Sequence, residues 1–135
     1  MTDVFTRLVG QDRAAAAMRQ YATNPVHAYL FTGPAGASVR DSLITFSAAL
    51  QCPRHGCGEC DICRLALAEQ DADVYFAERS GVSWRMEEIR EAERVARRRP
   101  LGEGYQIVVI EDVELTTTGA SPSAPALLKS LEEPP

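Results

Sequence analysis

The chain lacks the features that would send it to a membrane or out of the cell. Its longest apolar stretches, such as residues 107–110, are far too short to cross a bilayer. The N-terminus has no basic segment followed by an apolar one, so it shows no signal peptide. We therefore expect a cytoplasmic protein. Its 135 residues, 45% hydrophobic and 24% charged, exclude a wholly disordered chain and are typical of one globular domain.

Positive charge is scarce, and lysine is almost absent. The chain has 14 basic and 19 acidic residues, a net charge of −5, which argues against a protein that coats DNA by itself. Lys129 is the only lysine, and it falls in the last predicted helix. A mechanism that needs a lysine at a phosphate group therefore has a single candidate.

Short apolar runs alternate with helical patterns, which predicts an α/β fold with a parallel sheet. We expect strands at 27–32, 73–77 and 105–110, and helices at 11–21, 40–50, 61–69, 83–99 and 126–131. The fourth helix is expected to start at an N-cap, Ser83, and to bury one stripe: Met86, Ile89, Ala92, Val95 and Ala96. Two prolines, Pro122 and Pro125, are expected to delay the start of the last helix. No internal repeat is visible.

All four cysteines lie within twelve positions, in the spacing C-x4-C-x2-C-x2-C: Cys52, Cys57, Cys60 and Cys63. Four thiolates satisfy a tetrahedral Zn²⁺ and leave no open position for a catalytic water, so the pattern favours a closed, structural zinc site. Two other interpretations stay open, a disulfide or redox pair and unrelated buried thiols. His55 lies inside the loop as a substitute ligand, although a solvated loop position suits it better.

The turn that follows the first predicted strand is a degenerate phosphate-binding loop. ATP-binding loops need G-x-x-x-x-G-K-[ST], because the lysine neutralises phosphate charge and the hydroxyl holds Mg²⁺. Gly33 and Gly36 are present, but Ser38 replaces the second pattern glycine, Val39 the lysine and Arg40 the hydroxyl. We expect neither ATP hydrolysis nor a nucleotide cofactor. An ordinary strand-to-helix turn unrelated to nucleotides is the alternative.

The third predicted strand ends in V-V-I-E-D, where a Walker B motif would end in D-E. Glu111 and Asp112 keep both carboxylates but in swapped order. Such acids at a strand end are also common as solvated residues, so this motif gains weight only together with the degenerate loop.

The fourth predicted helix carries an arginine run, Arg97, Arg98 and Arg99, together with Arg90 and Arg94. They could face DNA phosphates or an acidic partner. The simpler interpretation is a solvated face paired with the glutamates at i, i+3 or i+4 spacing. The sequence does not assign a role to the Arg97–Arg99 run.

Several segments together resemble one family: Leu8–Gln11, Phe31–Gly36, Val108–Asp112, Ala126–Pro135, and the cysteine module after the phosphate-loop helix. They are similar to the N-terminal AAA+ module of the bacterial DNA polymerase III clamp loader. The degenerate loop resembles the delta-prime type rather than the ATP-hydrolysing gamma/tau type.

The resemblance implies a three-layer P-loop sheet over residues 1–135, with an inserted zinc module at about 52–63. It implies a non-hydrolysing member of a pentameric ring that assembles with delta and gamma/tau subunits. Within the assembled ring, that member would reach the sliding clamp and primed DNA as part of the DNA polymerase holoenzyme. The family's lid domain, collar domain and Ser-Arg-Cys motif would follow the last residue. We therefore expect a fragment or a truncated gene product.

Three other functions are consistent with the same residues. The first is a gamma/tau-type subunit that binds and hydrolyses ATP, against which Val39 argues directly. The second is a zinc module that binds nucleic acid alone, although Arg54, Glu59 and Asp61 are the only charges between the first and last cysteine. The third is a truncated remnant with only a structural zinc fold.

Overall fold

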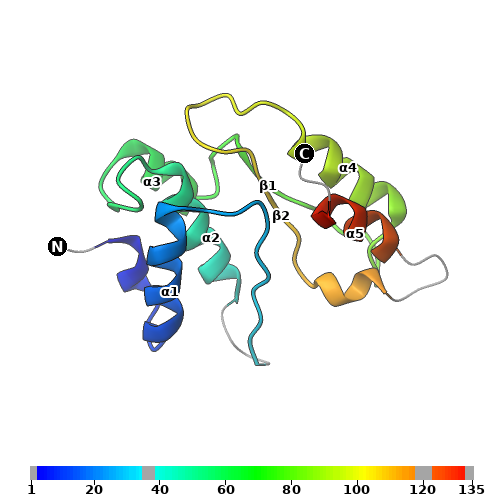
Figure 1. The fold of residues 1–135 in the computed structure, drawn as a ribbon, viewed down its shortest axis with the longest axis horizontal. Coiled ribbons are helices and arrows are strands. Elements are labelled where there is room, and N and C mark those ends of the chain that lie inside the picture. The colour runs from blue at the N-terminus through cyan, green and yellow to red at the C-terminus, as the bar shows by residue number, and fades with distance from the viewer. Residues whose placement is uncertain (1–2, 35–38, 118–122, 133–135) are drawn as a thin grey trace. The chain divides into compact units, whose positions relative to one another are not determined.

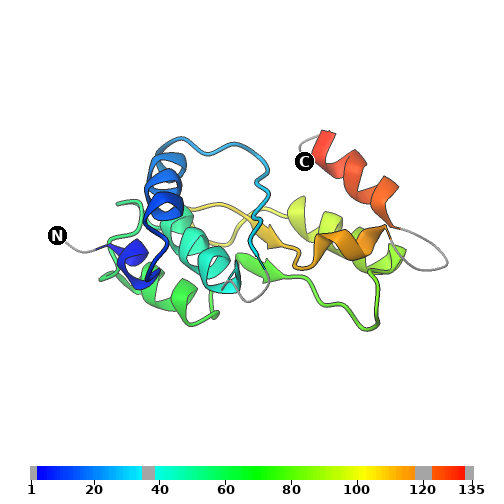
Figure 2. The same cartoon turned by 90° about the horizontal axis from the view of Figure 1, so that it is seen from below.

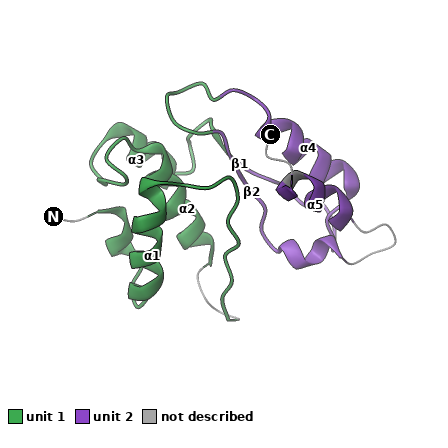
Figure 3. Ribbon diagram, viewed as in Figure 1, with its two compact units in different colours: residues 1–74, 100–105 green, residues 75–99, 106–135 purple. Residues whose placement is uncertain are grey.

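The computed structural model describes residues 3–34, 39–117 and 123–132. The chain forms two compact units (Figure 3). The first unit is Met1–Val74 with Pro100–Tyr105, and the second is Tyr75–Arg99 with Gln106–Pro135. Since the chain passes between them more than once, each unit is built from segments that are distant in sequence.

The first unit is helical. It contains the short 3-10 helix η1 (Val4–Arg7) and the α-helices α1 (Asp12–Thr23), α2 (Val39–Gln51) and α3 (Asp61–Leu67). Helix α2 is central: it contacts η1, α1 and α3 and buries most of its residues between Ile44 and Gln51. Figures 1 and 2 show α1 and α2 close together in both views. The second half of α2 is thus covered from several sides, so its polar residues Thr45, Ser47 and Gln51 are buried along with its apolar ones.

The predicted strand at 27–32 is wrong, since the structure assigns no strand to these residues. Tyr29 and Phe31 instead pack their rings on Phe46 of α2, with centroid distances of 5.0 and 5.6 Å. Leu30, which points the other way along the extended backbone, is 74% exposed. A strand requires a hydrogen-bonded neighbouring strand as well as an apolar pattern. This segment instead buries its aromatic side chains against a helix.

Residues 100–105 return to the first unit, where two buried polar side chains hold them. The carboxylate of Asp73 accepts hydrogen bonds from the backbone N–H groups of Leu101 (2.7 Å) and Gly102 (2.9 Å). The amide of Gln51 accepts from the N–H of Tyr105 (2.7 Å) and donates to its carbonyl (2.8 Å). The segment is therefore anchored by side chains that stand in for a neighbouring strand.

The second unit contains a two-stranded parallel sheet of β1 (Val74–Phe76) and β2 (Ile107–Val109). Strand β1 begins at the last residue of the first unit. The predictions at 73–77 and 105–110 are confirmed at their centres. The described residues thus form a small α/β fold with two strands, and the three-layer P-loop sheet that the resemblance implies is not seen in them.

Helix α4 (Met86–Ala96) of the second unit buries Ile89, Ala92 and Val95, as predicted. Its N-cap is Arg85, so the prediction of Ser83 is wrong, and it ends at Ala96 rather than near Arg99. The helix starts later because the buried Trp84 lies directly before it. The Glu88 carboxylate accepts the N–H groups of Arg85 and Ser80, both at 2.8 Å, and so closes the first turn.

Helix α5 (Ala124–Glu132) contacts α4 in the second unit, and the two helices are labelled next to each other in Figure 1. It includes Pro125 in its first turn, where a proline loses no helical hydrogen bond, so the expected delay of this helix by Pro125 is wrong. Pro122 lies outside the described residues. The short 3-10 helix η2 (Val113–Thr116) lies between β2 and α5 along the chain. Fully buried Ser123 joins these parts: its hydroxyl donates to the carbonyl of Trp84 at 3.0 Å.

No helix among the described residues combines the length and apolar character needed to cross a lipid bilayer.

Candidate metal centre and phosphate-loop region

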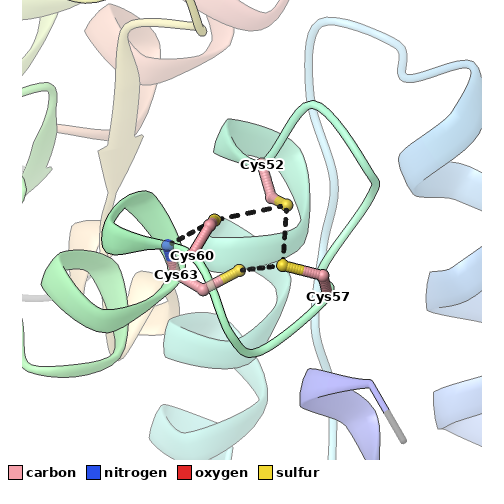
Figure 4. Close-up of side chains that lie close together, drawn as sticks. All are labelled: Cys52, Cys57, Cys60 and Cys63. Carbon is pink, nitrogen blue, oxygen red and sulfur yellow. Dashed lines mark hydrogen bonds between the residues drawn. The ribbon is translucent and has the colours of Figure 1, made fainter. Parts of the chain in front are cut away.

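Two elements and the loop between them bring the four cysteines together in the first unit. Cys52 follows the last residue of α2, Cys57 lies in the loop, Cys60 is the N-cap of α3, and Cys63 lies in its first turn. Figure 4 shows the four sulfur atoms pointing toward one another. All four lie within 4.8 Å of one another, and three of the residues are buried while Cys60 is partly exposed.

The sulfur positions fit a tetrahedral metal ion. The Sγ atom of Cys52 lies 3.7 Å from those of Cys57 and Cys60, and Cys57 lies 4.0 Å from Cys63. Four sulfurs at about 2.3 Å from a central Zn²⁺ would be separated by about 3.8 Å. The cysteines are thus positioned to bind a metal ion. A disulfide between them would need about 2.05 Å, and all four are free cysteines.

Backbone N–H groups point at each sulfur. Arg54 donates to Cys52, Glu59 to Cys57, Gly58 to Cys63 and Cys63 to Cys60, at 3.3–3.4 Å. Such donors stabilise a thiolate over a thiol. The cluster is therefore prepared for the deprotonated sulfurs that a metal ion requires.

The pKa values of the thiols reflect this competition between burial and hydrogen bonding. Burial opposes ionisation of Cys52, but the N–H groups of Cys57, Gly56 and Arg54 outweigh it and lower the pKa to about 6. The N–H of Glu59 lowers the pKa of Cys57. Burial raises the pKa of Cys63, and the adjacent sulfur of Cys52 adds to it. A divalent cation would offset the mutual repulsion of four thiolates.

The loop on both sides of Cys57, residues 53–59, depends on left-handed backbone conformations. Gly56 and Gly58 have φ values of +101° and +79°, which glycine adopts at little cost. His55 also has a positive φ, of +60°, and its side chain is exposed. Within the described residues the metal-binding cluster consists of the cysteines alone, so His55 is not brought into it.

The phosphate-loop region lies where α1, α2 and the extended segment meet in the first unit. Gly36 and Ser38 fall outside the described residues, whereas Gly33 is exposed and Val39 begins α2. Arg40 forms an ion pair with Glu69, just beyond α3.

A cavity of about 420 Å³ adjoins this region. Aromatic and aliphatic side chains form most of its wall, including Tyr21, Tyr29, Phe31 and Val39. None of its described lining residues is charged. The described part of the wall therefore presents aromatic, aliphatic and uncharged polar side chains.

The acidic pair follows β2 in the second unit. The backbone carbonyl of Glu111 accepts the indole N–H of Trp84 at 2.9 Å. Asp112 has a positive φ of +53° and caps η2, and its carboxylate lies 3.6 Å from the guanidinium of Arg79. Both carboxylates thus lie at the end of a strand, as predicted, and Asp112 has a cationic neighbour.

The arginines of α4 pair partly with glutamates on the same helix. Arg94 pairs with Glu91 at 2.5 Å and Arg97 with Glu93 at 3.7 Å. This is the spacing of the solvated-face interpretation, which these two pairs support. Lys129 is exposed on α5 in the same unit.

Sequence patterns did not point to several residues that contact these sites. Val4 packs on the cysteine loop, Glu69 pairs with Arg40, and Arg79 pairs with Asp112. Arg79 follows β1 closely, and this position at the end of a strand could have indicated that it lies near the acidic pair. Val4 and Glu69 had none, because their contacts depend on how distant segments pack.

Comparison with known proteins gives consistent matches. A family profile described as "DNA polymerase III, delta subunit" matches residues 11–135. The chain is 36% identical over 115 residues to the DNA polymerase III subunit delta' of Pseudomonas aeruginosa, covering 80% of this chain and 34% of that protein. It is 30% identical over 140 residues to the DNA polymerase III subunit tau of Bacillus subtilis, covering 97% of this chain and 24% of that protein.

A third relative is the DNA polymerase III subunit gamma/tau of Mycobacterium tuberculosis, 28% identical over 138 residues, with 97% of this chain and 23% of that protein covered. The chain thus spans about a quarter to a third of the length of the relatives it matches.

Proposed function

Because this chain belongs to the DNA polymerase III delta-subunit family, we propose that it serves DNA replication as the N-terminal part of a clamp-loader subunit of the delta-prime type. The observation that carries the proposal is the family match over residues 11–135. Its partners would be delta and gamma/tau subunits in the cytoplasm. The sliding clamp and primed DNA would be reached through the assembled complex.

The delta-prime assignment means a subunit that does not hydrolyse ATP. Val39 at the lysine position of the loop supports it, because no positive charge would neutralise the nucleotide there. Two observations point in the same direction: Arg40 pairs with Glu69, and the described residues that line the adjoining cavity are uncharged. We propose one AAA+-like domain over residues 1–135, whose three-layer sheet would be completed around the two observed strands.

For the cysteine cluster we propose structural zinc. Cys52, Cys57, Cys60 and Cys63 would hold the ion, and their backbone N–H donors support the thiolate form. With four sulfur ligands the ion would lack an open position for water, so its contribution would be to hold α2 and α3 together. The residues around the ion would hold it and orient its cysteine ligands.

The test is an assembly assay with two readouts. The full chain is mixed with delta and gamma/tau subunits from the same organism and passed over a size-exclusion column, and binding of Mg-ATP to the chain alone is measured by calorimetry. We expect co-elution with the partner subunits and no ATP binding at micromolar concentrations. Failure to co-elute would contradict the clamp-loader assignment and leave a folded remnant.

A rebuilt loop gives the matched control for the calorimetry. The variant Ser38→Gly, Val39→Lys, Arg40→Thr restores G-x-x-x-x-G-K-T. If this variant binds ATP and the natural chain does not, the loss is due to these positions. Micromolar binding by the natural chain would overturn the delta-prime proposal and favour the gamma/tau type, which the B. subtilis tau match also allows.

A further inference from the structure

The segment that precedes α1 lies against the loop that carries Cys57 in the first unit. The backbone N–H of Val4 donates to the carbonyl of Gly56 at 2.9 Å. The buried side chain of Val4 packs on Gly56 so closely that a Cβ at this glycine would lie 2.7 Å from its Cγ2 atom. Val4 also faces Gly58, where a Cβ would lie 3.8 Å from its Cγ1 atom. One side chain therefore covers both glycines that flank Cys57.

The same segment is fastened to α1 on its outer side. The guanidinium of Arg19 donates to both carboxylate oxygens of Asp3, at 2.6 and 3.1 Å. A carboxylate oxygen of Asp3 also accepts the N–H of Phe5 at 3.0 Å, which starts η1. The guanidinium of Arg19 lies 5.5 Å from the centre of the Phe5 ring. Asp3, Val4 and Phe5 are thus fixed from both sides, and we name them the brace.

None of the brace residues is a metal ligand, yet they determine the backbone around one. Cys57 is the ligand with no helix to position it, since it lies between two glycines of positive φ. Glycine gives such a loop many conformations unless contacts restrict it. Groups behind the ligands commonly fix ligand orientation and metal affinity.

We propose that the brace, with Val4 as the positioning residue of Cys57, sets how long the four-cysteine site retains its metal ion. The proposal rests on the proposed function, in which the cluster holds structural zinc. In the braced loop, the sulfur of Cys57 would keep its position beside the ion when another cysteine dissociates from it. Without Val4, the loop of residues 53–58 samples other conformations and the ion leaves sooner.

The test compares zinc release from the full natural chain with release from Val4→Ala. Zinc-loaded protein is mixed with excess EDTA, and the remaining bound zinc is measured over time. We expect release to be about tenfold faster in Val4→Ala, within the range typical for groups behind metal ligands. The matched control is Val9→Ala, because Val9 lies in the same part of the chain but is 90% exposed; its release rate should equal that of the natural chain.

A second readout separates positioning from general stability. Co²⁺ replaces zinc, and its ligand-field absorption bands report the geometry of the four sulfurs. We expect Val4→Ala to shift or weaken these bands and Val4→Ile, which keeps the branched side chain, to restore them. Unchanged bands and release within twofold of the natural chain, even with a lower melting temperature, would overturn the proposal.

Two further comparisons close the test. If Val4→Ala does not fold, Asp3→Asn loosens the brace from its exposed side without altering the core. We expect about twofold to threefold faster release from this variant, since it removes the charge but keeps the backbone contact of Val4. Equal release from Asp3→Asn and the natural chain would then overturn the brace. If the natural chain takes up no zinc, the proposed zinc centre is wrong. This result is distinguishable from a failure of the brace.

Discussion

At the scale of single residues, the first unit relies on buried polar side chains in place of a strand ladder. Gln51 is only 6% exposed and forms both hydrogen bonds to the backbone of Tyr105 that a neighbouring strand would form. Asp73 is equally buried and does the same for two successive N–H groups. Since unpaired buried polar groups are strongly unfavourable, each of these side chains makes the conformation of its segment specific.

Replacing Gly104 by alanine tests this arrangement. A Cβ at Gly104 would lie 2.2 Å from Oε1 of Gln51, so the amide would have to leave Tyr105. We expect Gly104→Ala to lower the free energy of unfolding by about 2 kcal/mol through two lost hydrogen bonds. Urea denaturation followed by circular dichroism measures the change. Gly81→Ala is the control, because no atom lies within 4 Å of the added carbon, and an equal effect in both variants would contradict the explanation.

The clustering of the four cysteines could be predicted from the sequence because they are close together along the chain. The spacing of Cys52, Cys57, Cys60 and Cys63 leaves few ways to separate the sulfurs, and the structure brings all four together. Val4 could not be predicted as a partner of this loop. It lies about fifty residues away in sequence, and its role follows from packing between segments rather than from a local motif.

At the scale of elements, helices were predicted more accurately than strands. The apolar stripe of α4 repeats with helical spacing, so Ile89, Ala92 and Val95 could be assigned to the core without any knowledge of their partners. Residues 27–32 have an equally apolar pattern but no strand forms. A strand is defined by its neighbour, and a pattern within one segment cannot say whether that neighbour exists. The start of α4 was missed for a related reason, since Trp84 fixes it through tertiary contacts.

Glu88→Gln tests the first turn of α4 and its dependence on pH. Burial raises the pKa of Glu88, but hydrogen bonds from the N–H groups of Arg85 and Ser80 outweigh it and hold the pKa below its ordinary value of 4.5. A carboxyl group with a lowered pKa stabilises the fold above that ordinary value, and the contribution is lost as the pH falls below it. At pH 7 we expect Glu88→Gln to be less stable by about 1 kcal/mol.

The measurement is urea denaturation followed by the fluorescence of Trp84, the single tryptophan, which lies in the same unit. The difference in the free energy of unfolding between the natural chain and the variant should become smaller as the pH is lowered from 4.5 toward 3. Glu87→Gln is the control, since Glu87 is the exposed neighbour on the same turn. A gap that stays constant with pH would show that the charge of Glu88 does not matter to the cap.

At the scale of the whole molecule, the two units are stabilised by different means. The core of the first unit includes three of the four cysteines among its buried residues, together with Phe5, Met18 and Phe46. The second unit is built around Trp84, α4 and the short sheet. The cysteine cluster is therefore part of one hydrophobic core rather than an appendage to the fold.

Removal of the proposed zinc ion should unfold the first unit. Structural zinc contributes about 10–16 kcal/mol in small zinc domains, comparable with the whole stability of an ordinary domain at about 5–15 kcal/mol. We expect EDTA treatment, or Cys63→Ser, to remove most of the helical circular dichroism of α1, α2 and α3, and added zinc to restore it in the EDTA-treated chain only. His55→Asn is the control, because His55 lies in the loop but outside the cluster. An unchanged spectrum after complete loss of zinc would contradict this expectation.

The chain passes from one unit to the other three times, after residues 74, 99 and 105. A single break between two codons therefore cannot divide the gene into one segment for each unit. Any such cut near these positions leaves at least one unit without a strand, a helix or the anchored segment 100–105. A segment that carries the whole first unit, residues 1–105, therefore also carries β1 and α4 of the second unit, but ends before the acidic pair after β2.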